Sequence, residues 1–366
     1  MKFQSDRDDL AASLATATRA VGSGRTGGGA VLSGLLIDAT TDALAITGTD
    51  LDLVIRVTQE ANVTTNGAVV LPARLATEIV RSLDDNQVQM ELAGDQVVIS
   101  SGRSLFTLLT FPVSEFPKIP EPENIGTYLP AAIVLEAIKQ VATAASNDNA
   151  RPLLTGVLLT RVEDNLRAVA TDSYRLSLRD LGVGALSKED DILVPARALN
   201  ELQRLKIADD EEIGIALGSH GVTFTVGTVS IFTRLLDGTY PNYQALIPTA
   251  CEAKVTIERE AFLEALRRVK VMVTDATTPL KLSFKDNEVT LCVKSPEVGE
   301  ATEMLNGTLE GAEMEMAFNA NYLIDGVEGV TEDEVVLEAT DPSKPAVIHG
   351  VDNQEYKYLI MPIRTS

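Results

Sequence analysis

The chain has 366 residues, a net charge of −22 and 45% apolar residues, with only two cysteines and two histidines. This length predicts several domains, because one hydrophobic core rarely organises more than about 250–300 residues. No apolar run approaches the roughly 18 residues that span a bilayer, and the opening MKFQSDRDDL lacks the apolar stretch of a signal peptide. We therefore expect a cytoplasmic protein with no membrane contact, disulfide framework, bound metal or cofactor.

The first elements predicted along the chain are a short strand at residues 2–4 and a helix at residues 6–20. Leu10, Leu14 and Ala17 recur at helical spacing and predict the buried face of this helix. Three aspartates in its first turn favour the positive end of the helix dipole.

A strand at residues 68–71 leads into a second predicted helix, with Pro72 at its first position. Leu75, Ile79 and Leu83 are expected to form the apolar stripe of this helix. Alternating apolar residues then predict antiparallel strands at 88–92, 96–100 and 104–109. The pattern indicates an α+β unit with a pair of helices on one side of antiparallel sheets.

This unit repeats. The stretch Gly34–Asp50 aligns without a gap to Gly156–Asp172, at an offset of 122 residues. The segment VVLPAR from Val69 likewise matches ILVPAR from Ile192. A fainter third copy is present in LKLSFKDNEVTLCVKS at residues 280–295. We predict three similar domains, at residues 1–124, 125–250 and 251–366, separated in Pro-rich stretches that are poor in apolar residues.

Cations recur at equivalent positions of the repeat, although 53 acidic residues outnumber 31 basic ones. Arg74 and Arg81 lie seven residues apart on one helical face, as do Arg197 and Arg204 in the second unit. The helix expected at residues 258–270 carries Arg267, Arg268 and Lys270 near its end. A single such pair is typical of a solvated helix face, but repetition favours one shared basic surface. Units repeated at constant spacing are readily closed into a ring with a positive lining.

Two other motifs point to chemistry that their context does not support. Gly22–Gly27 matches the G-x-G-x-x-G pattern of dinucleotide sites, yet it follows a predicted helix where that pattern requires a strand. Asp50 and Asp52 are close enough in sequence to hold magnesium, but Asp50 recurs as Asp172 inside the repeat. We predict that these repeated aspartates form hydrogen bonds in a turn.

Three further motifs carry a resemblance. TDSYRL at residues 171–176, DGTYPNY at 237–243 and MPIR at 361–364 occur in this order within the threefold repeat. With them the chain resembles, over its full length, the bacterial DNA polymerase III β subunit, the replicative sliding clamp. The resemblance implies three domains of the DNA clamp fold in each chain and a homodimeric ring that encircles duplex DNA.

The resemblance also implies a cleft that binds short peptides of partner proteins. Its residues are mostly apolar with a polar fringe, which suits such a groove. At 173–174 this chain has Ser-Tyr where the family often has Gly-His. Leu154, Leu176, Leu246 and Leu359 also have a simpler interpretation as core residues. The matching cleft positions are Leu154, Thr171, Ser173, Tyr174, Arg175, Leu176, Pro241, Leu246, Leu359, Met361, Pro362, Ile363 and Arg364.

Two further sets of positions follow from the resemblance. Pro152-Leu153 replaces the aromatic pair that usually follows the arginine at 151. Leu105 stands where an arginine is common at the dimer seam. DNA contact is expected at Arg25, Arg74, Arg151 and Arg197. The seam is expected to join Arg103, Phe106 and Leu108 of one copy to Val271, Met272, Glu297, Glu300 and Glu303 of another.

The function implied is that of a non-catalytic processivity factor. The expected partners are duplex DNA without sequence preference, the polymerase III α subunit and other polymerases, the clamp loader, mismatch-repair and ligase-type clients, and a second copy. One alternative is a peptide-binding scaffold of the same fold that does not encircle DNA. A metal-dependent hydrolase using the aspartates is a weaker one, because histidines are sparse.

Overall fold

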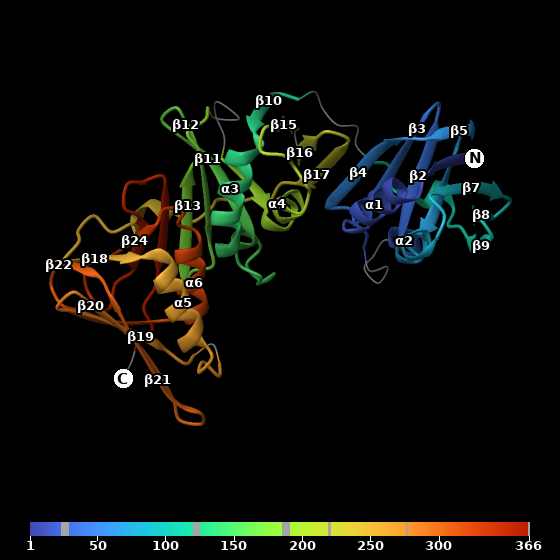
Figure 1. Ribbon diagram of the computed structural model, residues 1–366. Coiled ribbons are helices and arrows are strands. Elements are labelled where there is room, and N and C mark those ends of the chain that lie inside the picture. Colours follow the sequence, from blue (N-terminus) through green and yellow to red (C-terminus); the bar gives the residue numbers. More distant parts are fainter. Residues whose placement is uncertain (23–28, 120–124, 185–190, 219–220, 276, 365–366) are drawn as a thin grey trace. The chain divides into compact units, whose positions relative to one another are not determined.

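The computed structural model describes residues 1–22, 29–119, 125–184, 191–218, 221–275 and 277–364. They form two compact units, each built from two segments of the chain, which Figure 1 traces by sequence colour. The first unit comprises Met1–Ala131 with Arg204–Leu235, and the second Ala132–Gln203 with Leu236–Ser366. None of the helices in the described part of the chain has the length and apolar character needed to cross a bilayer.

Helices alternate with groups of strands, and the same order occurs three times along the chain. A strand and a helix are followed by three antiparallel strands, a strand leading into a second helix, and three more strands. The first and third copies have one additional short strand, Asn62–Thr65 or Thr308–Gly311, before the strand that leads into the second helix. This order agrees with the predicted threefold repeat. The helices are α1 Arg7–Thr18, α2 Ala73–Ser82, α3 Ala131–Val141, α4 Ala196–Gln203, α5 Arg259–Lys270 and α6 Ala320–Glu328.

The strands of the first unit form two antiparallel sheets. One has the order β5-β1-β7-β8-β9 and the other β10-β15-β16-β17-β4-β3-β2-β6. Helices α1 and α2 lie side by side against this unit (Figure 1). The strands are β1 Lys2–Asp6, β2 Gly34–Thr40, β3 Ala43–Thr49, β4 Leu53–Glu60, β5 Asn62–Thr65, β6 Gly67–Pro72, β7 Gln87–Ala93, β8 Gln96–Ser101, β9 Ser104–Leu109, β10 Thr127–Pro130, β15 Glu212–Leu217, β16 Gly221–Val226 and β17 Val229–Arg234.

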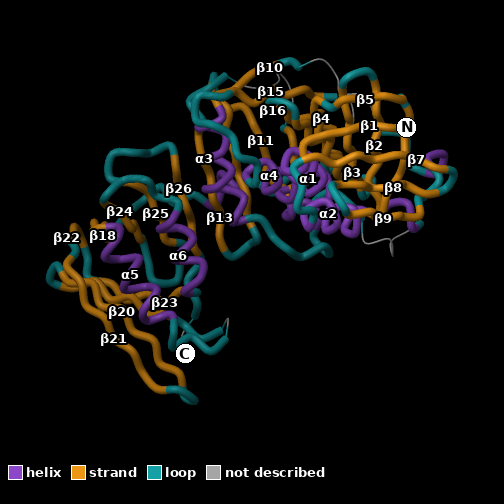
Figure 2. The backbone as a smooth tube through the Cα atoms, turned by 45° about the vertical axis from the view of Figure 1, so that its right-hand side comes forward, coloured by secondary structure: helices purple, strands orange, loops and turns teal. Residues whose placement is uncertain are grey.

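The second unit also has two antiparallel sheets, in the orders β14-β11-β12-β13-β26-β25-β24-β18-β22 and β21-β20-β19-β23. Helices α5 and α6 lie side by side beside them (Figure 2). The strands are β11 Gly156–Val162, β12 Asn165–Thr171, β13 Arg175–Asp180, β14 Ile192–Pro195, β18 Ala253–Glu258, β19 Leu280–Lys285, β20 Glu288–Ser295, β21 Gly299–Asn306, β22 Thr308–Gly311, β23 Met314–Phe318, β24 Glu334–Ala339, β25 Ala346–Gly350 and β26 Tyr356–Ile360.

Each of the two long sheets continues from one repeat into the next. In the first unit β4 pairs with β17, the last strand of the following repeat, with Val54 opposite Phe232. In the second unit β13 pairs with β26 in the same way, with Leu176 opposite Leu359. We name the β4–β17 pairing the first joint and the β13–β26 pairing the second joint. Both are built by backbone hydrogen bonds between repeats.

Local sequence explains where the helices begin. The Asp6 carboxylate accepts hydrogen bonds from the backbone N–H groups of Asp8 and Asp9, at 2.8 and 3.3 Å, so α1 begins at Arg7. Glu258 and Asn319 cap α5 and α6 in the same manner. The predicted first helix is therefore confirmed.

The apolar stripe predicted for α2 is partly wrong. Leu75 is 46% exposed, whereas Ala76, Ile79 and Val80 are buried, so the core-facing surface lies one position further along the helix. Pro72 ends β6 and stands at the N-cap, one residue before the helix. A leucine spacing of four residues marked a helix correctly, but Ala76 could not be recognised as a core position from hydrophobicity alone.

Candidate functional site

The same hydrogen-bonded turn precedes both joints. In the first, the Thr49 hydroxyl donates to the carbonyl of Leu53 at 3.0 Å and accepts from the Leu51 N–H. The Asp50 carboxylate accepts from the N–H groups of Asp52 and Leu53, at 3.2 and 2.9 Å. This confirms the turn role that the repeat predicted for Asp50.

The turn before the second joint has the same bonds. Thr171 donates to the carbonyl of Arg175 at 2.6 Å and accepts from the Ser173 N–H. Asp172 accepts from the N–H groups of Tyr174 and Arg175, at 2.9 and 3.0 Å. Ser173 has a φ of 80° in this turn. The turn holds the TDSYRL motif between the paired strands β12 and β13.

This turn brings the two ends of the predicted cleft together. The Met361 N–H donates to the carbonyl of Tyr174 at 2.9 Å, directly after the pairing of β13 with β26. Tyr174 is 60% exposed and Met361 43%. The Ile363 N–H donates to Ala317 at 2.7 Å, which holds the C-terminal segment against β23. Thus residues separated by almost 190 positions share one surface.

Buried leucines lie below this surface. Leu176 and Leu359 belong to one core cluster, and Leu154, at the end of the loop that carries Arg151, is also buried. Tyr243 joins the same cluster from the short 3-10 helix Tyr243–Leu246. The simpler interpretation as core residues therefore holds for three of the four leucines. We name the exposed or half-buried positions of the predicted cleft, which are Tyr174, Pro241, Leu246 and residues 361–364, the Tyr174 surface.

Leu246 differs from the other three leucines, because it is 49% exposed. Pro241 and Arg364 are exposed, Pro362 and Ile363 are half-buried, and Thr171 is buried. The set predicted from sequence is thus divided into an exposed apolar layer and a buried support. Such a layer can bind a short extended or helical peptide.

Arg151 and Arg175 lie at the turn in different environments. The Arg151 guanidinium binds Asp148 at 2.9 Å, the Asp172 carbonyl at 3.4 Å and the Ser173 hydroxyl at 3.2 Å. A residue predicted to contact DNA is therefore held against the rim of the Tyr174 surface. Arg175 points inward, and its side chain is only 10% exposed.

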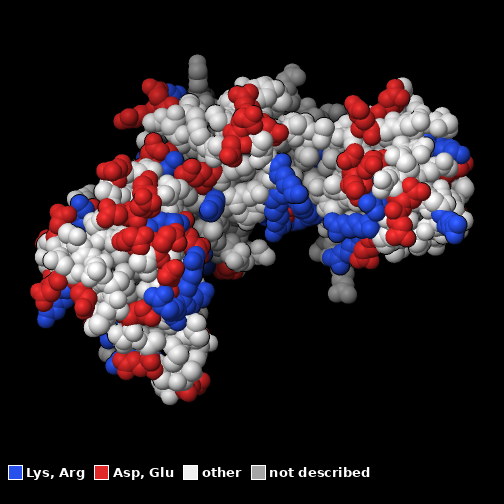
Figure 3. All heavy atoms as spheres, viewed as in Figure 1, with Lys and Arg blue, Asp and Glu red and all other residues white. Residues whose placement is uncertain are grey.

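Basic residues gather on helices, as the sequence predicted. Arg74 is exposed at the start of α2 and Arg197 at the start of α4. Figure 3 shows Lys and Arg side chains over α4 and α5, with acidic side chains over much of the remaining surface in view. The equivalent helix α6 has Asn321 and Glu328 at the positions of Arg74 and Arg81. Arg25 lies outside the described residues.

Two edge strands carry the residues predicted for the dimer seam. β9 ends the five-stranded sheet and exposes Phe106 at 37%, whereas Leu108 is buried in its own unit. β21 ends the four-stranded sheet, and Val271, just after α5, is 81% exposed. Arg103 and Glu297 are exposed, and Met272 is half-buried against the core.

The glutamates of β21 have partners within the chain. Glu300 binds Lys294 at 3.0 Å, and Glu303 binds Arg268 through two hydrogen bonds of 2.9 and 3.0 Å. These contacts lower the pKa of both carboxyl groups. Both carboxylates are therefore ionised at neutral pH, and each is paired with a cation.

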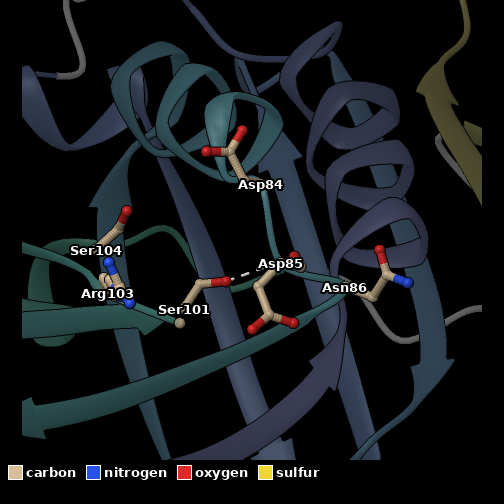
Figure 4. Close-up of a pocket in the computed structure, with 7 residues that line it drawn as sticks. Asp84, Asp85, Asn86, Ser101, Arg103 and Ser104 are labelled. Atoms are coloured by element: carbon tan, nitrogen blue, oxygen red, sulfur yellow. Dashed lines mark hydrogen bonds between the residues drawn. The ribbon is translucent and has the colours of Figure 1, made fainter.

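A polar pocket of about 510 Å³ lies beside Arg103 (Figure 4). The Ser101 hydroxyl donates to the carbonyl of Gln87 at 2.8 Å and to that of Asp85 at 3.4 Å. Only Arg103 was predicted from sequence, since the other residues belong to turns without a motif. The lining residues are Asp84, Asp85, Asn86, Ser101, Gly102, Arg103 and Ser104.

No group of three or more His, Cys, Asp or Glu residues suited to a metal ion occurs in the described ranges. Asp50 and Asp172 are instead used as turn acceptors. The aspartates thus give the hydrolase alternative no support.

Comparison with known proteins decides the family. The models of the N-terminal, central and C-terminal domains of the DNA polymerase III β subunit match residues 1–120, 128–242 and 244–364. The chain belongs to the DNA polymerase III β subunit family. It therefore has the three-domain clamp fold, and its function is that of a sliding clamp, a non-catalytic DNA polymerase processivity factor with DNA and polymerase partners.

Individual relatives agree with this assignment. The β sliding clamp of Streptomyces coelicolor is 34% identical, with both chains covered completely. A crystal structure of the DNA polymerase sliding clamp from Bacillus subtilis has a TM-score of 0.93 and 28% identity over the whole of both chains. A sliding clamp from Bartonella birtlesii bound to griselimycin has a TM-score of 0.93 and 30% identity, again over both full chains.

Proposed function

We propose that two copies of this clamp close into a ring around duplex DNA and tether polymerases through the Tyr174 surface. The three domains of each copy would be residues 1–124, 125–250 and 251–366. Because the link to DNA is topological, the lining can hold phosphates weakly and without regard to sequence, so the ring slides. Tethering raises the effective concentration of the polymerase at its substrate.

One observation carries the ring proposal. The two joints obey one rule, in which the strand after the turn of one repeat pairs with the last strand of the next. By this rule β21 of the third repeat needs the last strand of a first repeat, which is β9. Both strands are sheet edges in the described part of the chain. A second copy can supply both missing pairings at once, which closes a ring of six repeats.

The two edges are complementary in character. β9 offers exposed Leu105 and Phe106, and the β21 side offers exposed Val271 and Met304. Arg103 on the β9 side is opposite in charge to the glutamates of β21. Asp84 and Asp85 in the neighbouring pocket are opposite in charge to the cationic end of α5. Apolar contacts within a charged rim are typical of an interface that is stable but can be opened.

The lining of the ring would be basic. Arg74 and Arg197 start equivalent helices, and α5 adds Arg267, Arg268 and Lys270. Arg74→Glu with Arg197→Glu should weaken loading onto DNA or retention there and reduce the salt dependence of DNA binding, because each lost phosphate contact reduces the salt slope by about one. Arg161→Glu on β11 is the control. Unaltered loading of the double variant would show that these faces are ordinary surface.

The Tyr174 surface would bind short peptides of several partners. We propose the polymerase III α subunit, other polymerases, the clamp loader, and mismatch-repair and ligase-type clients, all working in the cytoplasm. Two such surfaces per ring would let partners exchange. Griselimycin, which is bound to the Bartonella clamp, should compete with these peptides for the same surface.

Met361→Ala with Pro362→Ala should abolish peptide binding and leave the dimer intact. The probe is a synthetic peptide from the polymerase α subunit of the same organism, measured by fluorescence anisotropy. Sedimentation tests whether the variant is still a dimer. A peptide affinity equal to that of the parent chain would reject the Tyr174 surface.

The decisive test of the ring is retention on nicked circular DNA after loading with the cognate loader and ATP. One restriction cut should release the protein from DNA with free ends, because only topology holds it there. Blocking both ends before the cut should prevent release. Retention on cut DNA with open ends would favour the scaffold that does not encircle DNA.

A further inference from the structure

We infer that Arg175 is a positioning residue, which holds the Tyr174 surface in shape from below and does not contact the bound peptide. This inference rests on the proposed peptide-binding role of that surface. It departs from the expectation drawn from the TDSYRL motif, in which Arg175 was one of the contact residues.

Most of the Arg175 guanidinium is engaged within the second unit. Nε donates to Asp172 at 3.0 Å, and one terminal nitrogen donates to the Asp325 carboxylate and to the Tyr358 hydroxyl. The other terminal nitrogen donates to the carbonyl of Thr143 at 2.5 Å. Four of the five N–H groups of an arginine are thus used. Little hydrogen-bonding capacity remains for a peptide.

An aromatic ring also covers the guanidinium. Its central carbon lies 4.2 Å from the centroid of the Tyr322 ring, which is cation–π distance. The side chain is 10% exposed. A peptide on the Tyr174 surface therefore meets Tyr174 and Met361, while Arg175 lies below them.

The partners of Arg175 come from four parts of the unit. Asp172 lies in the turn, Thr143 in the 3-10 helix after α3, Tyr358 on β26, and Asp325 with Tyr322 on α6. Within this turn, the Tyr174 carbonyl accepts the hydrogen bond from the Met361 N–H. One side chain thus connects the turn to the elements that support the C-terminal segment. Loss of the Arg175 side chain should therefore loosen the turn and the C-terminal segment together.

The repeat shows that the clamp fold does not need an arginine here. The equivalent residue of the first joint is Leu53, which is 2% exposed and begins β4 after the same hydrogen-bonded turn. A leucine therefore satisfies the fold. Burying a cation costs desolvation free energy that apolar packing does not, so the arginine at the second joint serves something local to that joint.

The charge on Arg175 is permanent. Burial lowers its pKa, but the contacts with Tyr358 and Asp325 raise the pKa above its ordinary value. The guanidinium therefore stays charged, and it acts as a fixed support.

The first test compares Arg175→Leu, which copies the first joint, with Arg179→Leu. Arg179 lies near the other end of β13, has a side chain that is 11% exposed, and makes ion pairs with Glu136 and Glu355 at 3.5 and 3.1 Å. Both variants remove buried ion pairs. The readout is hydrogen exchange at the Met361 amide. We expect at least tenfold faster exchange in Arg175→Leu and no change in Arg179→Leu. Unchanged exchange in Arg175→Leu would overturn the inference, whatever the effect of this substitution on peptide affinity.

The second test separates positioning from contact. The α-subunit peptide and its single-alanine versions are titrated against the parent chain, Arg175→Leu and Arg175→Lys. Positioning predicts that Arg175→Leu weakens every peptide by one common factor, of about tenfold, and that Arg175→Lys restores part of it. A loss that disappears with one particular alanine peptide would identify a direct contact and overturn the inference.

Two outcomes keep these tests distinct from the proposed function. If the parent chain binds the α-subunit peptide no better than Met361→Ala with Pro362→Ala does, the peptide-binding role fails, and the exchange experiment still decides the positioning role. If Arg175→Leu does not fold, Asp325→Asn removes one support from the α6 side. It should raise exchange at Met361 by a smaller factor, and unchanged exchange there would count against the inference.

Discussion

The first and second joints share a backbone but differ in almost every side chain at their surfaces. Both begin with a Thr-Asp turn, and in both the residue directly before the strand accepts a backbone bond at the end of the partner strand: Asp52 from the Arg234 N–H, and Tyr174 from the Met361 N–H. At the first joint these two residues form an exposed ion pair. At the second they are exposed and apolar.

This difference separates what the fold requires from what the function requires. The turn bonds recur at both joints, so they belong to the fold. The exposed apolar pair and the buried arginine occur at the second joint, so they mark the proposed peptide-binding site. A repeat thus supplies its own internal control, because the first joint shows how the clamp fold looks when no peptide surface is built on it.

The largest expected effect comes from imposing the first joint on the second. Tyr174→Asp with Met361→Arg should weaken binding of the α-subunit peptide by about 1000-fold, since it removes two central apolar contacts and a hot-spot contact contributes ~2 kcal/mol. Calorimetric titration measures this loss. The matched control is Asp52→Tyr with Arg234→Met at the first joint, which should leave peptide affinity unchanged. Equal losses of peptide affinity in both double variants would show that the two joints do not differ in peptide binding.

A smaller effect concerns the turn itself. Leu51 and Ser173 occupy equivalent positions, with φ values of 88° and 80°. Residues other than glycine adopt this left-handed region at a cost in free energy. Leu51→Gly should raise the free energy of unfolding by ~1 kcal/mol, because glycine adopts this region freely. Urea unfolding, with Leu51→Ala as control, provides the measurement.

Ser173→Gly should raise the free energy of unfolding by less than Leu51→Gly does. The reason is that Ser173→Gly also removes the hydroxyl that accepts a hydrogen bond from Arg151 at 3.2 Å. The difference between the two gains measures that bond. Destabilisation by Leu51→Gly would show that the Leu51 side chain, although 45% exposed, contributes packing that outweighs the backbone cost.

The smallest expected effect is that of the ion pair at the first joint. Arg234 and Asp52 are 4.0 Å apart and largely exposed, at 65% and 80%. A double-mutant cycle with Asp52→Asn and Arg234→Gln should give a coupling below ~0.5 kcal/mol, as for other exposed pairs. A coupling above ~1 kcal/mol would mean that the pair helps to hold the first joint.

Much of the fold was predictable because it depends on local patterns. The helix at α1 followed from spacing and aspartates in the first turn, and the turn role of Asp50 and Asp172 followed from their recurrence. Leu75 was misassigned, since an alanine took its place in the core. The Tyr174 surface was identified only through resemblance, because hydrophobicity does not distinguish the exposed Leu246 from the buried Leu176.

The role of Arg175 could not be predicted from sequence. Its acceptors Asp325 and Tyr358 lie 150 and 183 positions away, and an arginine in a short polar motif is usually interpreted as exposed. Nor does any motif mark Asp84 and Asp85, which border a pocket only because the turn after α2 and the β8–β9 turn meet. Long-range contacts of this kind require the folded chain.

The open edges have a consequence for the newly synthesised chain. An unpaired strand can add to any other exposed strand, so β9 and β21 are sites where wrong association could begin before a second copy is met. The ion-paired glutamates of β21 limit this risk, because charged side chains on an edge strand oppose its pairing with another strand. In the proposed ring the same charged edge would face Arg103 of another copy, so one feature would serve both the single chain and the assembly.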